Sequence, residues 1–186
     1  MIDPDKLWAQ NGCENIIVDC LSRTGIRNKT CCEFGAWDGM KFSNTAYFVR
    51  ELDWQCLFIE SVEERAARCR AWYSRFPKAS VLCSPVTVEN INVVIPDGLD
   101  LLSIDVDGND YWLWNALETR PGLVVIEFNP RAHNRPYDPT FVRQENDYGY
   151  GATEDSLVRL ALWKGYERLA SDGHCNLFFG AKERLT

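Results

Sequence analysis

Short apolar runs alternate with helix-like segments along most of this chain, and this alternation constrains the fold more than any other feature. The run 99–105 is mostly apolar, as a strand buried on both faces of a sheet must be. Alternating strands and helices predict an α/β fold, in which helices cover both faces of a mostly parallel sheet. The expected strands are residues 30–34, 55–60, 80–83, 99–105, 123–128, 166–170 and 176–180. The expected helices lie within residues 5–24 and at 46–52, 62–73, 111–117 and 156–164.

A chain of 186 residues suits one domain with a single sizeable core. We therefore interpret residues 1–186 as one domain that begins with a helical segment over residues 1–28. Gly25 is a suitable C-terminal stop for the helix in that segment. Residues 129–152 form a long polar and aromatic loop, and a loop of this length in a small domain is usually functional or disordered. A functional loop is the favoured interpretation, and a mobile surface insert is the alternative.

The acidic charge balance narrows the possible partners. The net charge of −7 and the sequence pI near 4.9 disfavour binding along a nucleic-acid backbone, because that affinity comes from clustered Lys and Arg. A metal site or a neutral substrate is compatible with this charge. No apolar run approaches the roughly 20 residues that span a bilayer, and the start Met1–Asp5 lacks the apolar segment of a signal peptide. We therefore expect a cytoplasmic protein without a membrane span.

The eight cysteines contain no C-x-x-C pair, so the sequence does not favour a structural zinc site. Cys32, Cys56 and Cys83 lie in or beside apolar runs, and we interpret most of the cysteines as small buried hydrophobes in a reducing compartment. The adjacent Cys31 and Cys32 could instead be redox-active. Neighbouring residues of a strand point to opposite faces, however, which disfavours that alternative.

A glycine turn follows the first expected strand, in the run Cys-Cys-Glu-Phe-Gly-Ala-Trp-Asp-Gly over residues 31–39. Glu33 closes the strand, and Gly35 and Gly39 open the turn. Glycine lets a backbone approach a ligand closely, because it has no Cβ. The other turn residues expected near the ligand are Ala36, Trp37 and Asp38. An ordinary strand-to-helix turn with glycine for its geometry is the alternative.

A second acid, Glu60, ends the next expected strand, about 20 residues after the glycine turn. A carboxylate at this place can accept hydrogen bonds from both hydroxyls of a ribose. The spacing E-x-G-x-x-x-G differs from the dinucleotide fingerprint G-x-G-x-x-G and favours S-adenosylmethionine over NAD. Glu33 would then accept a hydrogen bond from the methionyl ammonium group. The adenosine is expected near Ser61, Val86 and Thr87. The alternative for Glu60 is a solvated strand end.

Three carboxylates follow the strand 99–105, at Asp105, Asp107 and Asp110. Open α/β sheets bind ligands beyond the carboxyl ends of their strands. Like charges are costly to cluster, so a cluster at such an edge suggests a use. Asp105 and Asp107 can project into the pocket, whereas Asp110 can instead cap the following helix.

The fifth expected strand ends at Glu127, which is followed two residues later by Asn129. A carboxylate beside a deeply apolar run needs a partner. Asp105, Glu127 and Asn129 offer oxygen ligands on adjacent strand tips, which suits Mg²⁺, Mn²⁺ or Ca²⁺. Without a metal, these groups would hydrogen-bond the loop backbone and the substrate. His133 lies just beyond, as a general base, a substrate contact or a solvated loop residue.

Together these segments resemble class I S-adenosylmethionine-dependent methyltransferases of the FkbM type. The segments are Glu33–Gly39, Ser43–Thr45, Glu60, Asp105–Asp110 and Val125–Pro130. That family carries Ile-Asp-x-Glu-Gly-x-Glu after its fourth strand, and this chain has Asp107 and Asp110 in place of the two glutamates. The resemblance extends over about residues 30–180 of the chain.

The resemblance implies a Rossmann-like class I methyltransferase fold, with a seven-stranded sheet and an antiparallel C-terminal strand. It implies methyl transfer to a hydroxyl oxygen, often on a sugar, with residues 129–152 as the acceptor loop. Related sugar methyltransferases hold a divalent metal at the tips of strands four and five, which coincides with Asp105, Glu127 and Asn129. Asp107 or His133 would take the proton. Cofactor contacts at Asp105, Asn44 and Thr45 also follow from the resemblance.

Other functions stay open on the sequence alone. The methyl acceptor could be a protein side chain or a small natural product, and the chain could be a non-catalytic S-adenosylmethionine-binding module. An NAD dehydrogenase is disfavoured, because its glycine fingerprint is absent. The small size is also compatible with one domain of a larger glycan-processing protein.

Overall fold

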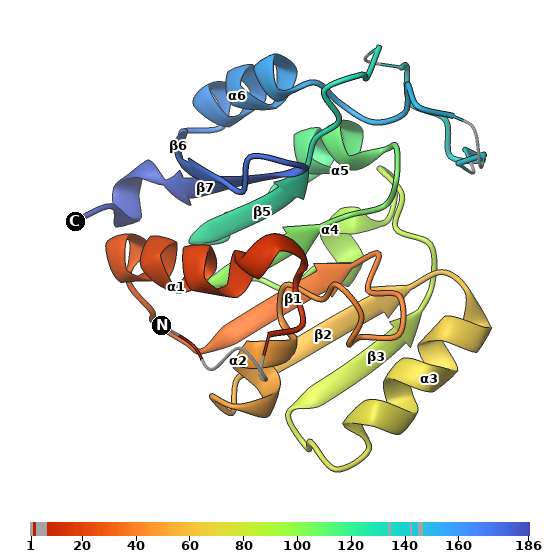
Figure 1. Cartoon of the computed structure of the whole chain (residues 1–186), viewed down its shortest axis with the longest axis vertical. Helices are drawn as coiled ribbons and strands as arrows, with labels where there is room; N and C mark the ends of the chain where they lie inside the picture. Colours follow the sequence, from red (N-terminus) through yellow and green to blue (C-terminus); the bar gives the residue numbers. More distant parts are fainter. Residues whose placement is uncertain (1, 3–6, 134, 142, 145–146) are drawn as a thin grey trace.

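The computed structural model describes residues 2, 7–133, 135–141, 143–144 and 147–186, whose strands form one seven-stranded sheet (Figure 1). The strand order is β3-β2-β1-β4-β5-β7-β6. The strands are β1 (Thr30–Phe34), β2 (Gln55–Glu60), β3 (Ala79–Cys83), β4 (Leu101–Ile104), β5 (Leu123–Glu127), β6 (Tyr166–Ser171) and β7 (Asn176–Ala181). The helices are η2 (Gln10–Gly12), α1 (Cys13–Thr24), α2 (Ala46–Arg50), α3 (Glu63–Tyr73), α4 (Ile91–Val94), α5 (Asp110–Ala116), α6 (Glu154–Trp163) and η3 (Lys182–Arg184).

The pairing confirms a mostly parallel sheet with an antiparallel C-terminal strand. The pairs β1–β2, β1–β4, β2–β3 and β4–β5 are parallel, whereas β7 pairs antiparallel with both β5 and β6. The strand order reverses next to β1, since β2 lies on one side of it and β4 on the other. Such a reversal opens a crevice at the carboxyl ends of the strands, where α/β folds bind their ligands.

All seven expected strands are present, and the differences lie at element ends. The fourth strand begins at Leu101, because the preceding Asp100 accepts hydrogen bonds from the 27–29 backbone. The first long helix begins at Cys13, and residues 5–6 of the helical stretch expected over 5–24 lie outside the described residues. The short helix α4 was not expected, since a single helical turn carries too little periodicity to be recognised.

Two apolar cores cover the two faces of the sheet. Helices α1, α2 and α3 contribute to one core, together with Cys31 and Phe178. Helices α4, α5 and α6 contribute to the other, together with the adjacent residues Cys32 and Phe179. Successive strand residues point to opposite faces, so each neighbouring pair serves both cores. The helices thus hold the sheet rigidly on both sides and leave its carboxyl edge for a site.

The cysteines are free thiols, and most of them belong to these cores. Cys83 and Cys175 are half-buried, and the other six are buried, as expected for small hydrophobes. In the part of the chain that the structure describes, no helix is long and apolar enough to cross a membrane.

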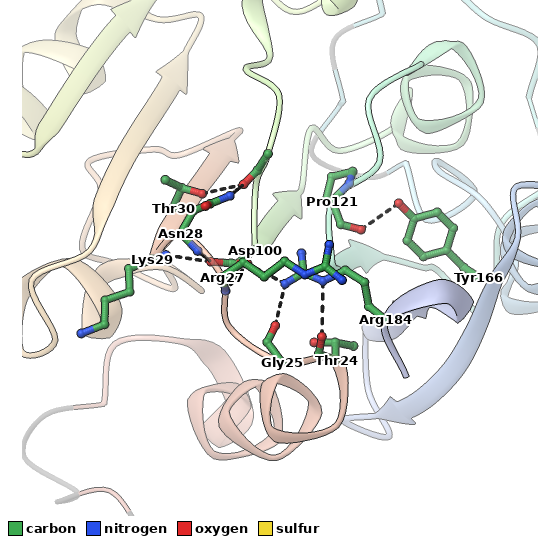
Figure 2. Close-up of polar contacts among 11 residues, drawn as sticks. Thr24, Gly25, Arg27, Asn28, Lys29, Thr30, Asp100, Pro121, Tyr166 and Arg184 are labelled. Atoms are coloured by element: carbon green, nitrogen blue, oxygen red, sulfur yellow. Dashed lines mark hydrogen bonds and ion pairs between the residues drawn. The ribbon is translucent and has the colours of Figure 1, made fainter. Parts of the chain in front are cut away.

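A buried ion pair connects the C-terminal end of the chain to the amino-terminal edge of the sheet (Figure 2). Arg184 Nη2 lies 2.7 Å from Asp100 Oδ1 and also donates to the carbonyl oxygen of Gly25. Asp100 accepts hydrogen bonds from the backbone nitrogens of Arg27, Asn28 and Lys29. The pair lies at the opposite edge of the sheet from the crevice, so it supports the fold rather than the site.

Candidate functional site

A cavity of about 380 Å³ lies at the carboxyl ends of the parallel strands. Five acidic side chains from four strand ends contribute to its wall: Glu33, Glu60, Asp105, Asp107 and Glu127. The described parts of the loop 129–152 lie beyond the end of β5 (Figure 1), and Pro139, Phe141 and Arg143 complete one side. The cavity therefore occupies the place where the strand order predicts a ligand.

Gly35 is required by the close approach of the backbone at the end of β4. Its φ is +78°, and a Cβ built on it would lie 1.4 Å from the carbonyl oxygen of Asp105. Gly39 is similar, since a Cβ there would lie 2.5 Å from Cys69 Sγ. The structure therefore gives each of these glycines a packing role within the chain, and Gly35 also lines the cavity. Gly35 lets the end of β1 approach β4 closely enough to place Asp105 in the cavity.

We expect Gly35→Ala to destabilise the protein by about 3 kcal/mol or more, because the methyl group collides with backbone that cannot swing away. The matched control is Gly173→Ala. Gly173 has nearly the same φ, +77°, but nothing lies within 4 Å of its added Cβ, so only about 1 kcal/mol of backbone strain is expected. Chemical denaturation of both variants measures the difference. Equal destabilisation would show that the contact with Asp105 is unimportant.

Glu60 ends β2 with both carboxylate oxygens held by the backbone. Its Oε2 accepts a hydrogen bond of 2.9 Å from the Trp37 nitrogen, and its Oε1 accepts one of 2.8 Å from the Val62 nitrogen. These bonds fix the carboxylate in the cavity wall beside Ser61. Oε1 also accepts a long hydrogen bond of 3.4 Å from the Ser61 hydroxyl, whereas Oε2 can accept a second hydrogen bond from a ribose hydroxyl.

Glu33 is almost fully buried, and its carboxylate binds the segment Ser43–Thr45 that follows the turn. Its carboxylate accepts hydrogen bonds from the hydroxyls of Ser43 and Thr45 and from the Asn44 nitrogen. Burial raises the pKa of Glu33, and these hydrogen bonds oppose the rise. Glu33 still reaches the cavity wall, but Asn44 and Thr45 do not line it. The Asn44 amide instead donates to Ser103 Oγ in β4.

The other predicted cofactor residues divide into two groups. Ala36, Trp37, Ser61, Val86 and Asp105 line the cavity with Gly35, as expected. Asp38, Gly39 and Thr87 do not line it. Asp38 accepts hydrogen bonds from the Met40 and Lys41 nitrogens within its own turn, and Thr87 begins the turn of α4.

The carboxylates of Asp105, Asp107 and Glu127 form a cluster in the cavity wall. One oxygen from each lies within 4.8 Å of the others. Burial raises the pKa of Asp105 well above its ordinary value, and the nearby charges of Asp110 and Asp107 raise it further. The pKa of Glu127 is likewise raised well above normal, by burial and then by Asp105. A bound cation would remove this repulsion, which is the electrostatic setting of a metal site.

Asp110 is the first residue of α5 and does not cap it, because the N-cap position is Asn109 and the Asp110 carboxylate binds the preceding turn. Its two oxygens accept hydrogen bonds of 2.9 Å from the nitrogens of Val106 and Gly108. Burial raises the pKa of Asp110 to about 6, and those backbone hydrogen bonds oppose the rise. Asp110 thus shapes the turn that presents Asp107, whose own φ of 55° is left-handed.

Asn129 and His133 contact other residues of the loop 129–152. The Asn129 amide nitrogen donates to the carbonyl oxygens of Tyr148 and Tyr150, and its Oδ1 accepts from the Arg131 nitrogen. The third oxygen donor of the cluster is therefore Asp107, where the sequence suggested Asn129. His133 is exposed and packs against Gly149, and it does not line the cavity.

Sequence reasoning missed Arg143, which faces the cluster from the loop. Its Nη1 lies 2.8 Å from Asp107 Oδ1, and its guanidinium lies 4.2 Å from the centre of the Tyr150 ring. Phe141 packs against Gly108, where an added Cβ would lie 2.3 Å from the ring. The sequence offered no signal for these contacts, because both residues lie in a loop without periodicity. Only the excess of negative charge at Asp105, Asp107 and Glu127 could have suggested a positively charged partner.

A second cavity of about 270 Å³ adjoins the turn that presents Asp107. Its wall combines the aromatic residues Tyr111 and Trp112 with Arg135. The remaining lining residues are Gly108, Gly151, Ala152 and Ser156. Trp112 Nε1 donates to the Arg135 carbonyl oxygen, so the loop is fastened to α5 at this wall.

Several solved structures that resemble this chain are methyltransferases. The N-terminal domain of EvdMO1, solved in the presence of SAH and D-fucose, is 12% identical, with a TM-score of 0.62 over 100% of this chain and 85% of that one. An S-adenosylmethionine-dependent methyltransferase from Clostridium acetobutylicum ATCC 824 is 12% identical, with a TM-score of 0.61 over 96% of this chain and 92% of that one. This chain has the class I methyltransferase fold. A SAM-dependent methyltransferase from Aquifex aeolicus, 14% identical, has a TM-score of 0.56 over 96% and 93% of the two chains.

The similarity concerns the fold and not a closer family. No protein-family model matches the sequence, and no curated protein sequence matches it. The resemblance to FkbM-type enzymes therefore stays a prediction. The identities of 12–14% carry no assignment of substrate.

Proposed function

We propose that this protein is an S-adenosylmethionine-dependent O-methyltransferase that acts on a hydroxyl group of a sugar or glycan, with help from a divalent metal. One observation carries the proposal. A single cavity at the carboxyl edge of a class I methyltransferase sheet joins Glu60, placed for a ribose, to the cluster of Asp105, Asp107 and Glu127. Cofactor and reaction centre would thus share one cavity.

The cavity residues fit the cofactor. Glu60 would accept hydrogen bonds from the ribose hydroxyls, and Trp37, Ser61 and Val86 would surround the nucleoside. The volume of about 380 Å³ lies in the range of small-molecule sites. When bound, S-adenosylmethionine supplies an electrophilic methyl group. The chain's own part is to hold the acceptor oxygen in line with that group, and such positioning is a large source of rate.

The three carboxylates fit a hard divalent cation such as Mg²⁺ or Mn²⁺, because they are oxygen donors with spare negative charge. A cation held there would supply a Lewis acid that lowers the pKa of the acceptor hydroxyl. Asp107, which lines the cavity as part of the cluster, would take the proton. Asp107 is preferred to His133 for that role, because His133 does not line the cavity.

The acceptor would enter beside the loop 129–152. Pro139 and Phe141 line this side of the main cavity, and the rings of Tyr111 and Trp112 line the second cavity nearby. Aromatic faces of this kind suit sugar rings. The solved structure of EvdMO1 in the presence of SAH and D-fucose, itself of an N-terminal domain, supports a sugar acceptor and a place in a larger protein.

Two measurements test the proposal. Calorimetry with S-adenosylmethionine and S-adenosylhomocysteine tests cofactor binding, and binding of neither would overturn it. A methyl-transfer assay over a panel of glycans, with small natural products and peptides as comparison acceptors, tests the reaction class. Repetition with EDTA, followed by re-addition of Mn²⁺, tests the metal. Cofactor binding without transfer to any acceptor would instead support a non-catalytic binding module.

We expect Glu60→Gln to weaken S-adenosylmethionine binding about tenfold to a hundredfold, because hydrogen bonds to a charged group contribute about 1.5–3 kcal/mol. Glu64→Gln, an exposed position in α3 that pairs with Arg68, is the matched control and should leave binding unchanged. Calorimetric titration of both variants gives the dissociation constants. Thermal unfolding must accompany it, since Glu60 also binds the Trp37 and Val62 backbone. Unchanged affinity in a folded Glu60→Gln protein would remove Glu60 from the cofactor site.

A further inference from the structure

Arg143 is the described cation that pairs directly with the three-carboxylate cluster. Its Nη1 lies 2.8 Å from Asp107 Oδ1. Among the described residues, no ion pair within 4.0 Å and no hydrogen bond reaches the carboxylates of Asp105 or Glu127. One guanidinium therefore faces three carboxyl groups, and with all three ionised the excess negative charge would equal the charge of a divalent cation.

Arg143 and a metal ion would both bind the carboxylate of Asp107. The cluster oxygens lie within 4.8 Å of one another, and Mg²⁺ binds oxygen at about 2.0–2.1 Å, so the three carboxylates need to converge only slightly. Asp107 already holds the guanidinium at 2.8 Å. A divalent ion on the same carboxylate would lie within a few ångströms of a second positive charge and would repel it.

We propose that Arg143 and a divalent cation bind this cluster in competition. Arg143 neutralises the cluster when no metal is bound, and metal binding releases Arg143 together with the part of the loop that carries it. The inference rests on the metal site of the proposed function. Arg143 and the neighbouring Phe141 both line the cavity, so their release changes the wall on the side where the acceptor is proposed to enter.

Arg135 provides a matched control in the same loop. Its Nη2 lies 2.9 Å from Asp147 Oδ2, and the exposed fraction of its side chain is 45%, against 43% for Arg143. The two arginines thus share loop, charge and exposure, and they differ in whether their partner belongs to the cluster. Arg143→Gln and Arg135→Gln therefore separate competition at the cluster from a general loss of positive charge.

The first experiment titrates Mn²⁺ into the full chain by calorimetry, without cofactor. We expect Arg143→Gln to bind Mn²⁺ about tenfold more tightly than the unmodified protein, because a repelling charge is removed. Arg135→Gln should bind as the unmodified protein does. Unchanged or weaker binding by Arg143→Gln would overturn the inference, since Arg143 would then be irrelevant or would support the ligands.

The second experiment follows the release of Arg143 itself. Trypsin cleaves after exposed arginines, and we expect saturating Mn²⁺ to accelerate cleavage after Arg143. Cleavage after Arg131, whose guanidinium lies over the Tyr148 ring away from the cluster, is the internal reference. Cleavage after Arg143 that slows or stays constant contradicts the inference.

The outcomes are distinguishable from failure of the proposed function. If no variant binds Mn²⁺, the metal site and the competition both fail, whereas methyl transfer can still occur without metal. S-adenosylmethionine binding is measured separately on the same samples. Tight cofactor binding with no effect of Arg143→Gln on Mn²⁺ would overturn the inference alone.

Discussion

Asp105→Asn is expected to abolish turnover and to leave S-adenosylmethionine binding largely intact. Asp105 joins the cluster to the end of β4, and its carboxylate would hold the metal or polarise the acceptor hydroxyl. The amide removes one negative charge and one oxygen donor with little change in shape. We expect turnover to fall by about 10³-fold or more, since general-base and metal contributions each reach that order. Single-turnover methyl transfer, with calorimetry of cofactor binding, measures both quantities.

Asp155→Asn is the matched control for this experiment. Asp155 lies on the exposed surface of α6, paired with Arg159, and its replacement removes the same charge far from the cavity. It should retain full turnover. Loss of cofactor affinity in Asp105→Asn with normal single-turnover chemistry would contradict the role, because Asp105 would then act in binding and not in the reaction.

The sheet could be predicted from the sequence because each strand is a short apolar run with its own boundaries. All the expected strands are present, and the carboxyl ends of β1, β2, β4 and β5 bring their acids to one cavity. Acids at strand ends were therefore the reliable signal for the site. Their position follows from the parallel sheet alone and needs no knowledge of side-chain packing.

The details that the sequence could not supply depend on contacts between distant segments. Gly35 was interpreted as a glycine that a ligand approaches, and the sequence could not reveal its contact with the Asp105 carbonyl oxygen. Asn129 was predicted as a metal ligand by its place after β5, but its Oδ1 accepts a hydrogen bond from the Arg131 nitrogen, and its amide nitrogen donates to the loop carbonyls of Tyr148 and Tyr150. Arg143 has no periodic or motif context, so its pairing with Asp107 was invisible. The sequence predicts that a polar residue at a strand end lies at the carboxyl edge of the sheet. Contacts with the loop then decide which of these residues can still bind a ligand.

The contacts that hold the C-terminal end of the chain also join distant segments and could not be predicted from the sequence. Asp100 immediately precedes β4, and the sequence placed it within the expected strand 99–105 without a role of its own. In the structure, it is fully buried and joins three segments distant in sequence (Figure 2). A buried carboxylate requires partners, and Arg184 with the 27–29 backbone provides them.

Loss of the Asp100–Arg184 pair is expected to cost a large part of the stability of the protein. Arg184→Met should lower the free energy of unfolding by about 3 kcal/mol, at the low end of the range for broken buried pairs, because three backbone nitrogens still bind Asp100. Asp100→Asn should cost about 5 kcal/mol, since an amide cannot accept all of these hydrogen bonds and leaves Arg184 without an anion. Chemical denaturation at neutral pH measures both values. Arg159→Met, which removes an exposed pair with Asp155, should change stability by less than about 1 kcal/mol.

The pH dependence gives this prediction a second, independent test. Hydrogen bonds from Arg184 and from the 27–29 backbone hold the pKa of Asp100 below its usual value, against the opposing effect of burial. A depressed pKa in the folded state contributes stability that is fully present above the unfolded pKa, about 3.9, and is lost as the pH falls through the folded pKa. The stability difference between the unmodified protein and Asp100→Asn should therefore be constant above about pH 5 and shrink below about pH 4. A difference that stays constant down to pH 3, in a protein still folded there, would show that ionised Asp100 is not what stabilises the C-terminal end.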